Sequence, residues 1–186
     1  MSSGASRTIQ KLEAARCQLQ TAIQLWFAGG DPISIHTLTC AAHQIFHDLH
    51  RHRGSQNLQF DLFDSPFVRE GRRPDWIRAV KEHMNFFKHA DRNPNGTIVF
   101  DPSLTEPFIM FSLLTLEDLG AEPTSEERAF FAWSALNNSD WRNEQGLAKF
   151  INHLPVDQIA HLRGQVAKKD FYRLYNLAIH NIQIGE

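Results

Sequence analysis

The sequence predicts an all-α fold, a single-domain helical bundle that spans residues 1–186 and begins with a long helical hairpin. Apolar residues recur at three- and four-residue steps between the turn segments, which is the pattern of amphipathic helices. Capping residues mark where these segments begin, and Gly, Asn and Pro mark where they end. With 42% hydrophobic residues, the chain is long enough for one full core and short for two.

Two consecutive helices form the predicted hairpin. The first is expected over residues 6–28, where the apolar stripe is continuous, and Gly29-Gly30 ends it. Asp31 is suited to cap the second helix, and Pro32 is suited to its first turn. This second helix is expected to continue to about residue 53, so that the two helices lie against each other.

Further helices follow the same signals. Pro74 opens the third helix, and Gly120 ends the fourth. Thr124 and Glu127 form a capping box for the fifth, and Gly164 is a candidate break within the last. The helices after the hairpin are expected at residues 75–90, 104–119, 124–137, 140–153 and 155–182.

Two segments lack a helical pattern. Residues 55–73 are polar and interrupted by Pro66 and Gly71, so we expect an irregular loop there. The sequence TIVFD at residues 97–101 is the one candidate for a short extended piece.

The charge balance excludes a general attraction to phosphate backbones or anionic lipid. Lys and Arg total 19 against 21 Asp and Glu, so any surface for nucleic acid must be local. Basic residues cluster at 51–53 and 69–73, and near a catalytic histidine such clusters would form an RNA groove. No phosphate loop or dinucleotide motif occurs, and we expect no cofactor.

The sequence also bears on the compartment. The N-terminus lacks the basic start and apolar run of a signal peptide, and no apolar stretch approaches the roughly 20 residues that cross a bilayer. Cys17 and Cys40 are too few for a disulfide scaffold, and we expect both to be free core thiols. These observations predict a cytoplasmic protein without membrane contact.

A face rich in histidine follows the second predicted helix. His36, Cys40, His43, His47 and His50 share it, because their spacings are four, three, four and three. The apolar stripe lies roughly 120 to 140° away around the helix, so we expect the histidines to avoid the main core. They would form a polar seam, or pack against another helix or a second subunit. The alternative is a metal site at His43, His47 and His50.

A polar face on the third predicted helix is the strongest candidate for chemistry. Taking Arg78 as zero, Glu82, Asn85 and His89 lie within about 40° of it. An imidazole can move a proton from a ribose 2′-hydroxyl, and a guanidinium can stabilise a charged phosphorane. This face is therefore suited to RNA cleavage. Together with the family resemblance given below, it predicts metal-independent cleavage, with His89 as acid and base, Asn85 orienting and Arg78 contributing positive charge. A solvated helix face is the alternative.

The hairpin AIQLWFAGGDPISIHTLTCAAHQIFHDL at residues 22–49 and the string NFFKHAD at 85–91 resemble the HEPN domain (higher eukaryotes and prokaryotes nucleotide-binding). The resemblance implies an all-α core over residues 6–120, with additional helices over 124–182. It also implies a protein that binds or cleaves RNA in a toxin–antitoxin or defence setting. Because the family forms its active cleft between two subunits, a homodimer is implied as well.

The family signature is an Arg, a polar residue directly after it, and a His four to six residues from the Arg. Asn85 matches the polar position and His89 the histidine, while Met84 stands where the arginine is expected. An alternative function follows from this departure, namely a non-catalytic interaction or dimerisation module with the same fold. A histidine-rich metal-binding bundle is the second alternative.

Two other frames have the spacing of the signature. Arg78 to His83 has four intervening residues, and Arg173 to His180 has six. In both frames an apolar residue follows the arginine, where the family has a polar one.

Overall fold

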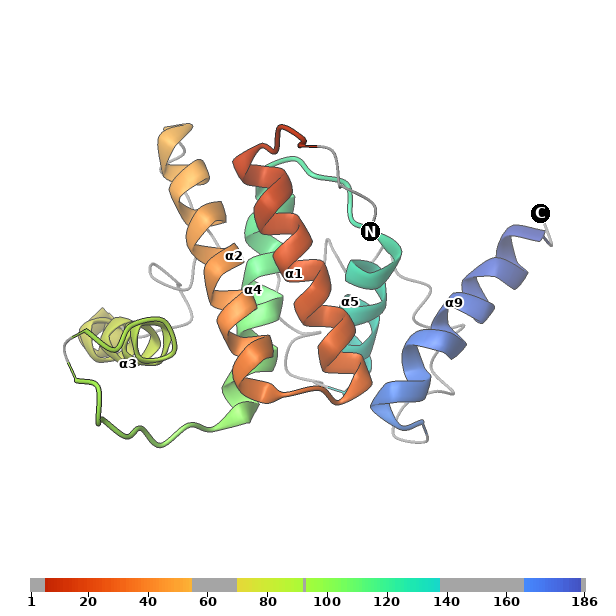
Figure 1. Cartoon of the computed structure of the whole chain (residues 1–186). Helices are drawn as coiled ribbons and strands as arrows, with labels where there is room; N and C mark the ends of the chain where they lie inside the picture. The colour runs from red at the N-terminus through yellow and green to blue at the C-terminus, as the bar shows by residue number, and fades with distance from the viewer. Residues whose placement is uncertain (1–5, 55–69, 92, 138–165, 185–186) are drawn as a thin grey trace.

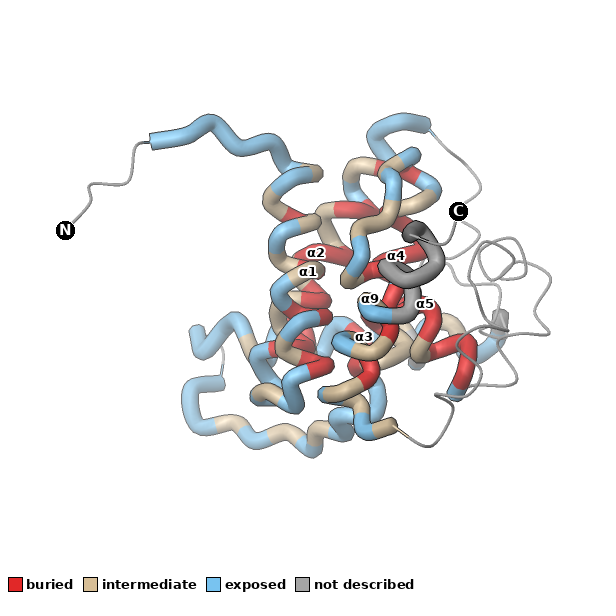
Figure 2. The backbone as a smooth tube through the Cα atoms, turned by 90° about the vertical axis from the view of Figure 1, so that its right-hand side faces the viewer, coloured by how far each residue is buried: buried red, intermediate tan, exposed pale blue. Residues whose placement is uncertain are grey.

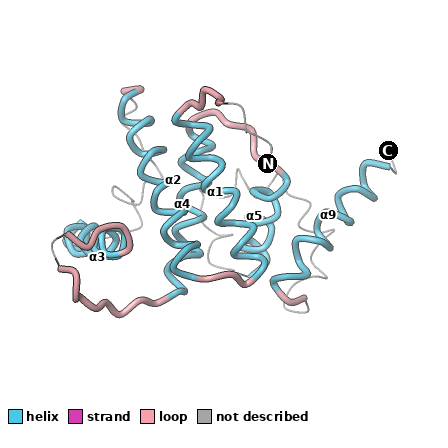
Figure 3. The backbone as a smooth tube through the Cα atoms, in the orientation of Figure 1, coloured by secondary structure: helices cyan, strands magenta, loops and turns pink. Residues whose placement is uncertain are grey.

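The structure, a computed structural model, describes residues 6–54, 70–91, 93–137 and 166–184. Within these ranges the regular elements are helices and no strand forms, so the predicted all-α bundle is confirmed (Figure 3). Short 3-10 helices, η1 and η2, precede α3 and α4. The elements in chain order are α1 (Lys11–Ala28), α2 (Pro32–His52), η1 (Glu70–Arg72), α3 (Arg73–Phe86), η2 (Pro102–Leu104), α4 (Thr105–Asp118), α5 (Ser125–Asn137) and α9 (Lys168–Ile184).

Helices α1 and α2 form the predicted hairpin (Figure 1). Gly29 ends α1 with a φ of 69°, a left-handed conformation that favours glycine, and its N–H donates to the Trp26 carbonyl at 3.2 Å. Asp31 caps α2, because its carboxylate accepts from the Ser34 N–H at 2.7 Å, and Pro32 occupies the first turn. Both cap predictions are confirmed.

Helix α4 packs against α2 and carries apolar side chains on most of its circumference. A helix of this kind is stable in water only when other elements cover it, and most residues over 108–116 are buried (Figure 2). Within it the Ser112 hydroxyl donates to the Phe108 carbonyl at 2.8 Å, which satisfies a buried polar group. Gly120, with a φ of 79°, follows the helix as predicted. None of the described helices is both long and apolar enough to span a membrane.

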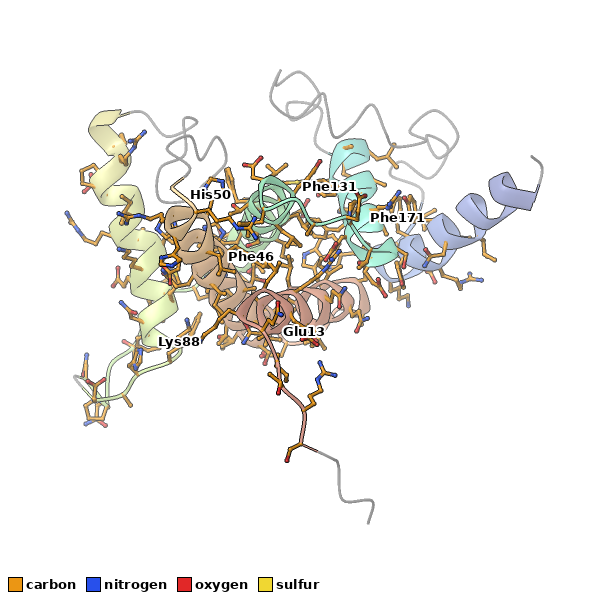
Figure 4. The ribbon with its side chains drawn as sticks, turned by 90° about the horizontal axis from the view of Figure 1, so that it is seen from above. Glu13, Phe46, His50, Lys88, Phe131 and Phe171 are labelled. Carbon is orange, nitrogen blue, oxygen red and sulfur yellow. The ribbon has the colours of Figure 1, made fainter. Side chains whose placement is uncertain are left out.

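Aromatic side chains join α1 to α5 and α9. The Trp26 ring lies 4.9 Å from the Phe130 ring, edge to face, and the Phe27 ring stacks on Phe171 at 6.3 Å. Lys168 places its ammonium 4.0 Å from the centre of the Trp26 ring, a cation–π contact. Figure 4 shows Phe171 between α9 and α5, where it is fully buried.

A buried ion pair ties α1 to α5. The Glu127 carboxylate is fully buried and accepts from Arg16 Nε at 3.1 Å and from Arg16 Nη2 at 2.9 Å. The same carboxylate accepts from the Thr124 N–H at 2.8 Å, while the Thr124 hydroxyl accepts from the Glu127 N–H at 3.4 Å. This reciprocal pair is the predicted capping box. One carboxylate therefore starts α5 and also holds it against α1.

Two helix boundaries differ from the prediction. Residues 6–10 are exposed and not helical (Figure 2), and the extended residue before Lys11 makes no side-chain capping bond. Without a cap or a buried face, this segment has nothing to offset the cost of ordering it as helix. The helix predicted over 75–90 runs instead from Arg73 to Phe86.

The strand candidate and one cysteine were also predicted wrongly. Residues 97–101 form no strand, since no second strand exists among the described residues to pair with, and the Val99 side chain is 93% exposed. Cys40 is buried as expected, but Cys17 is exposed on the outer side of α1. Both are free thiols.

Some predictions fall outside the described residues. These are residues 55–69 of the loop predicted over 55–73, the helix over 140–153, and the first part of the helix over 155–182. The end of that last prediction is confirmed by α9. The described end of the loop differs from the prediction, because Glu70–Arg72 form η1 and α3 begins at Arg73.

Replacing Arg16 with Met should destabilise the fold, because it leaves the Glu127 carboxylate buried without its cation. We expect a loss of about 2 to 4 kcal/mol in the free energy of unfolding, measured by urea denaturation. The double variant Arg16→Met/Glu127→Gln should recover part of this loss, since no charge then remains buried.

Arg7→Met supplies the matched control. Arg7 pairs with Glu13 on the surface, where both side chains are about half exposed or more, so its loss should cost under about 1 kcal/mol. Equal destabilisation by the two substitutions would contradict the role assigned to the buried pair.

Candidate functional site

Helix α3 lies beside α2 and runs roughly across its direction (Figure 1). One side of α3 is buried and the other is exposed. On the buried side Val80 and Met84 pack with Cys40 and Phe108 in a small apolar cluster separate from the main core. The open side carries three exposed side chains of the predicted polar face: Arg78, Glu82 and Asn85. The predicted division of this helix into an apolar and a polar face is confirmed for its described side chains.

The end of α3 places His89 beside the helix. After Phe86 the chain makes a turn, in which the Lys88 N–H donates to the Asn85 carbonyl at 3.2 Å. The His89 N–H donates to the same carbonyl at 3.0 Å. This bond joins residues four apart, as in an α-helix, so His89 lies about one helical turn from Asn85. His89 therefore remains close to Asn85 although it lies beyond the helix. Figure 4 shows Lys88 at this end of α3.

A pocket of about 410 Å³ opens at this end of α3. Its volume falls within the range of about 300 to 1,000 Å³ typical of small-ligand sites. Residues of the helix and of the following turn form its walls: Glu82, Asn85, Phe86, His89, Asp91 and Asn93. The structure thus brings together three of the four predicted polar residues and adds an exposed aromatic ring.

Arg78 is not part of the pocket wall. Its guanidinium lies 3.4 Å from the Asp75 carboxylate, one turn back along α3, and both side chains are largely exposed. Met84, at the position where the resemblance requires an arginine, is buried against α2 and α4. Among the described residues that line the pocket, none carries a guanidinium.

The polar atoms of the wall define which ligands it can hold. Glu82 and Asp91 contribute carboxylates, which when ionised only accept hydrogen bonds. The side-chain amides of Asn85 and Asn93 both donate and accept, and the imidazole of His89 can exchange a proton. A ligand with both donors and acceptors along one edge suits this set, whereas a bare phosphate would meet two carboxylates.

Neither of the two other frames of the signature forms a site among the described side chains. His83 faces the bundle, with Nδ1 3.0 Å from the Ala79 carbonyl and Nε2 3.1 Å from the Val99 carbonyl. Through these contacts the His83 ring holds the segment around Val99 against α3. In the other frame Arg173 is exposed on α9, and the side chain of His180 lies outside the described set.

The histidines of α2 are buried, although on a face away from the main core, as expected. His36, His43, His47 and His50 are all buried, and Cys40 on the same face belongs to the small cluster separate from the main core. The reason is that α2 is covered on two sides, by α1 and α4 on one and by α3 with the start of α4 on the other. Of the expected outcomes, packing against another helix is the one observed.

His36 is the centre of the second covered face. Its Nδ1 lies 3.1 Å from the Thr105 hydroxyl, and its ring contacts the rings of His83, Phe100 and Phe108 at centroid distances of 6.2, 5.1 and 5.0 Å. Burial, together with the nearby His83, lowers the pKa of the His36 imidazole to about 4. The ring is therefore neutral at physiological pH.

Neither Cys40 nor a metal-binding group forms a reactive site among the described residues. Burial raises the pKa of the Cys40 thiol to about 12, so it is not a nucleophile at neutral pH. No group of three or more His, Cys, Asp or Glu side chains in the described ranges could hold a metal ion. His43, His47 and His50 are thus buried imidazoles rather than an assembled ligand set.

The basic clusters do not border the pocket. Arg72 and Arg73 lie at the start of α3, and the helix of 14 residues separates them by about 20 Å from the end where His89 lies. Arg53, from the other cluster, donates to the Leu119 carbonyl at 2.8 Å and holds the end of α4. The predicted groove of basic residues around His89 is therefore absent from the described surface.

Comparison of the chain with family models, with curated proteins and with solved structures finds no match. The site must accordingly be interpreted from its own geometry.

Sequence patterns alone did not place Asp91 and Asn93 in the site, because they follow the helix and have no helical periodicity. The Asn93-Pro94-Asn95-Gly96 turn was the available signal. Its Gly96 N–H donates to the Asn93 carbonyl at 3.1 Å, so Asn93 begins the turn, while Asp91 lies at the bend before it.

Stability should fall as the pH drops from about 6.5 toward 4, because the unfolded chain protonates His36 near its ordinary pKa and the folded chain only near 4. Between pH 7.5 and 4.5 this one group accounts for about 2 to 3 kcal/mol of the unfolding free energy. The variant His36→Gln should lose that part of the pH dependence.

Urea unfolding at pH 7.5 and at pH 4.5 measures the change in unfolding free energy between the two pH values. A loss of stability that the substitution causes equally at both pH values cancels in this change. His52→Gln, at an exposed position near the end of α2, is the control and should keep the wild-type dependence. A wild-type slope in His36→Gln would show that another group is responsible.

Proposed function

We propose that the chain is a HEPN-like protein that binds single-stranded RNA at the pocket at the C-terminal end of α3. We propose further that it acts as a cytoplasmic homodimer in a toxin or defence setting. One observation carries the proposal: Asn85 and His89, which match two positions of the signature, line one pocket with the exposed ring of Phe86. Unstacked bases bind on aromatic rings and pair their edges with amides and carboxylates, and the pocket offers each of these groups.

The same geometry supports a cleavage step by His89. An imidazole at the pocket can take the proton of a ribose 2′-hydroxyl, and the Asn85 amide can orient that hydroxyl. The 2′-oxygen then bonds to the adjacent phosphorus as the bond from phosphorus to the 5′-oxygen breaks, and the imidazolium returns its proton to that leaving oxygen. Arg78 stands one turn before Glu82 and about two turns before Asn85. Its exposed pair with Asp75 is worth under about 1 kcal/mol, so a phosphate can replace the carboxylate. The positive charge for the transition state would come from this residue or from the second subunit.

A second candidate is a non-catalytic interaction or dimerisation module. Met84 favours it, because the residue at the arginine position is apolar and packs in the cluster beneath α3. Under this alternative the pocket still forms, but no guanidinium reaches a bound phosphate and no bond is broken.

RNA binding and RNA cleavage are tested separately. Fluorescence anisotropy with a labelled single-stranded RNA in the presence of EDTA should show binding, and gel analysis of the same mixture should show cleavage. In His89→Ala cleavage should fall by at least 100-fold, roughly the contribution of a general acid–base group, with binding reduced much less.

His52→Ala is the matched control, since His52 is an exposed histidine on α2 and should change neither readout. Binding without cleavage by the wild-type protein would select the non-catalytic candidate. Cleavage that persists in His89→Ala would remove the assignment of His89, and absence of binding would overturn the proposal.

A further inference from the structure

The wall of the α3 pocket carries both hydrogen-bond acceptors and hydrogen-bond donors. Its two carboxylates, from Glu82 and Asp91, accept from donors, and its two amides also offer donors to a ligand's acceptors. A ligand that satisfies both kinds of group brings N–H groups and carbonyl-type acceptors together.

Guanine is the base that meets this requirement. Its Watson–Crick edge places N1–H and the N2 amino group side by side, and one carboxylate can accept both in parallel. The O6 acceptor next to them suits an amide donor such as that of Asn85 or Asn93. Adenine, cytosine and uracil each present a single donor position on that edge, so none forms the paired contact.

The remaining parts of a nucleotide also find suitable surroundings. Phe86 is 38% exposed although it is a large apolar side chain, and it lines the pocket where a base could stack on its ring. The phosphates would be repelled from the carboxylates and would lie outside the pocket. Arg78 and Lys88 are exposed on α3 and on the turn after it, within reach of a backbone that passes the pocket mouth.

We propose that the pocket selects guanine, so that the RNA bound by this protein is recognised at an unpaired G. This inference rests on the proposed function and specifies its substrate. A protein arginine offers the same paired donors to a carboxylate, but it has no acceptor for the amides of Asn85 and Asn93. The guanine base uses both kinds of group on the wall, which is why we favour it.

The test compares four heptamers that differ only at the centre, UUUGUUU, UUUAUUU, UUUCUUU and UUUUUUU, by fluorescence anisotropy with the full-length protein. The guanine heptamer should bind at least about tenfold more tightly, the usual discrimination from one paired contact. In Glu82→Gln/Asp91→Asn the preference should fall to about twofold or less. Binding of the all-uridine heptamer should be unchanged or stronger, because negative charge is removed.

Glu122→Gln/Asp48→Asn is the charge-matched control, since both carboxylates are exposed and lie outside the pocket wall, and it should keep the guanine preference. Binding of all four heptamers with equal affinity, or a preference that survives the double variant, would overturn the inference and leave RNA binding intact. Absence of any RNA binding would remove both proposals. Displacement of RNA by arginine methyl ester at lower concentration than by GMP would assign the pocket to a protein partner and overturn the guanine inference.

Discussion

The burial of α2 on two sides is the constraint on which the rest of the structure depends. Its apolar side faces α1 and α4, and its histidine side is covered by α3 and the start of α4. Covering the second side fixes where α3 can lie, because Val80 and Met84 must reach Cys40 and Phe108 to be buried. The orientation of α3 then decides which of its residues remain open to solvent. The candidate site is thus a consequence of how α2 is enclosed.

Local signals predicted most of the helices. The caps at Asp31 and Thr124 and the left-handed glycines at 29 and 120 act over a few residues, so the sequence around them is sufficient. Local signals did not predict which segments cover the histidine face of α2. A helical wheel gives the angle between two faces, but which face is covered depends on segments far away in the chain. The same limit applies to residues 97–101, whose extended conformation finds no partner strand.

The candidate site was predictable to the extent that it is helical. Glu82 and Asn85 share a face through the regular spacing of α3, and His89 keeps that spacing through one more backbone bond. Arg78 is on the same face yet one turn too far toward the start of the helix to line the pocket. Asp91 and Asn93 lie beyond the helix end, where the chain bends and turns, and they line the pocket without helical spacing. A site at a helix terminus combines residues on the helix with residues that follow it. Helical periodicity in the sequence identifies only the residues on the helix.

The pair between Arg16 and Glu127 also bears on the order in which the chain can fold. The two residues are 111 positions apart, so the α1–α2 hairpin leaves the ribosome long before α5 can cover it. During that interval Trp26 and Phe27 lack the aromatic partners that α5 and α9 provide. The nascent hairpin therefore passes through a stage in which these aromatic side chains are exposed to solvent. During this stage, protection against self-association must come from chaperones or from rapid synthesis of the remaining chain.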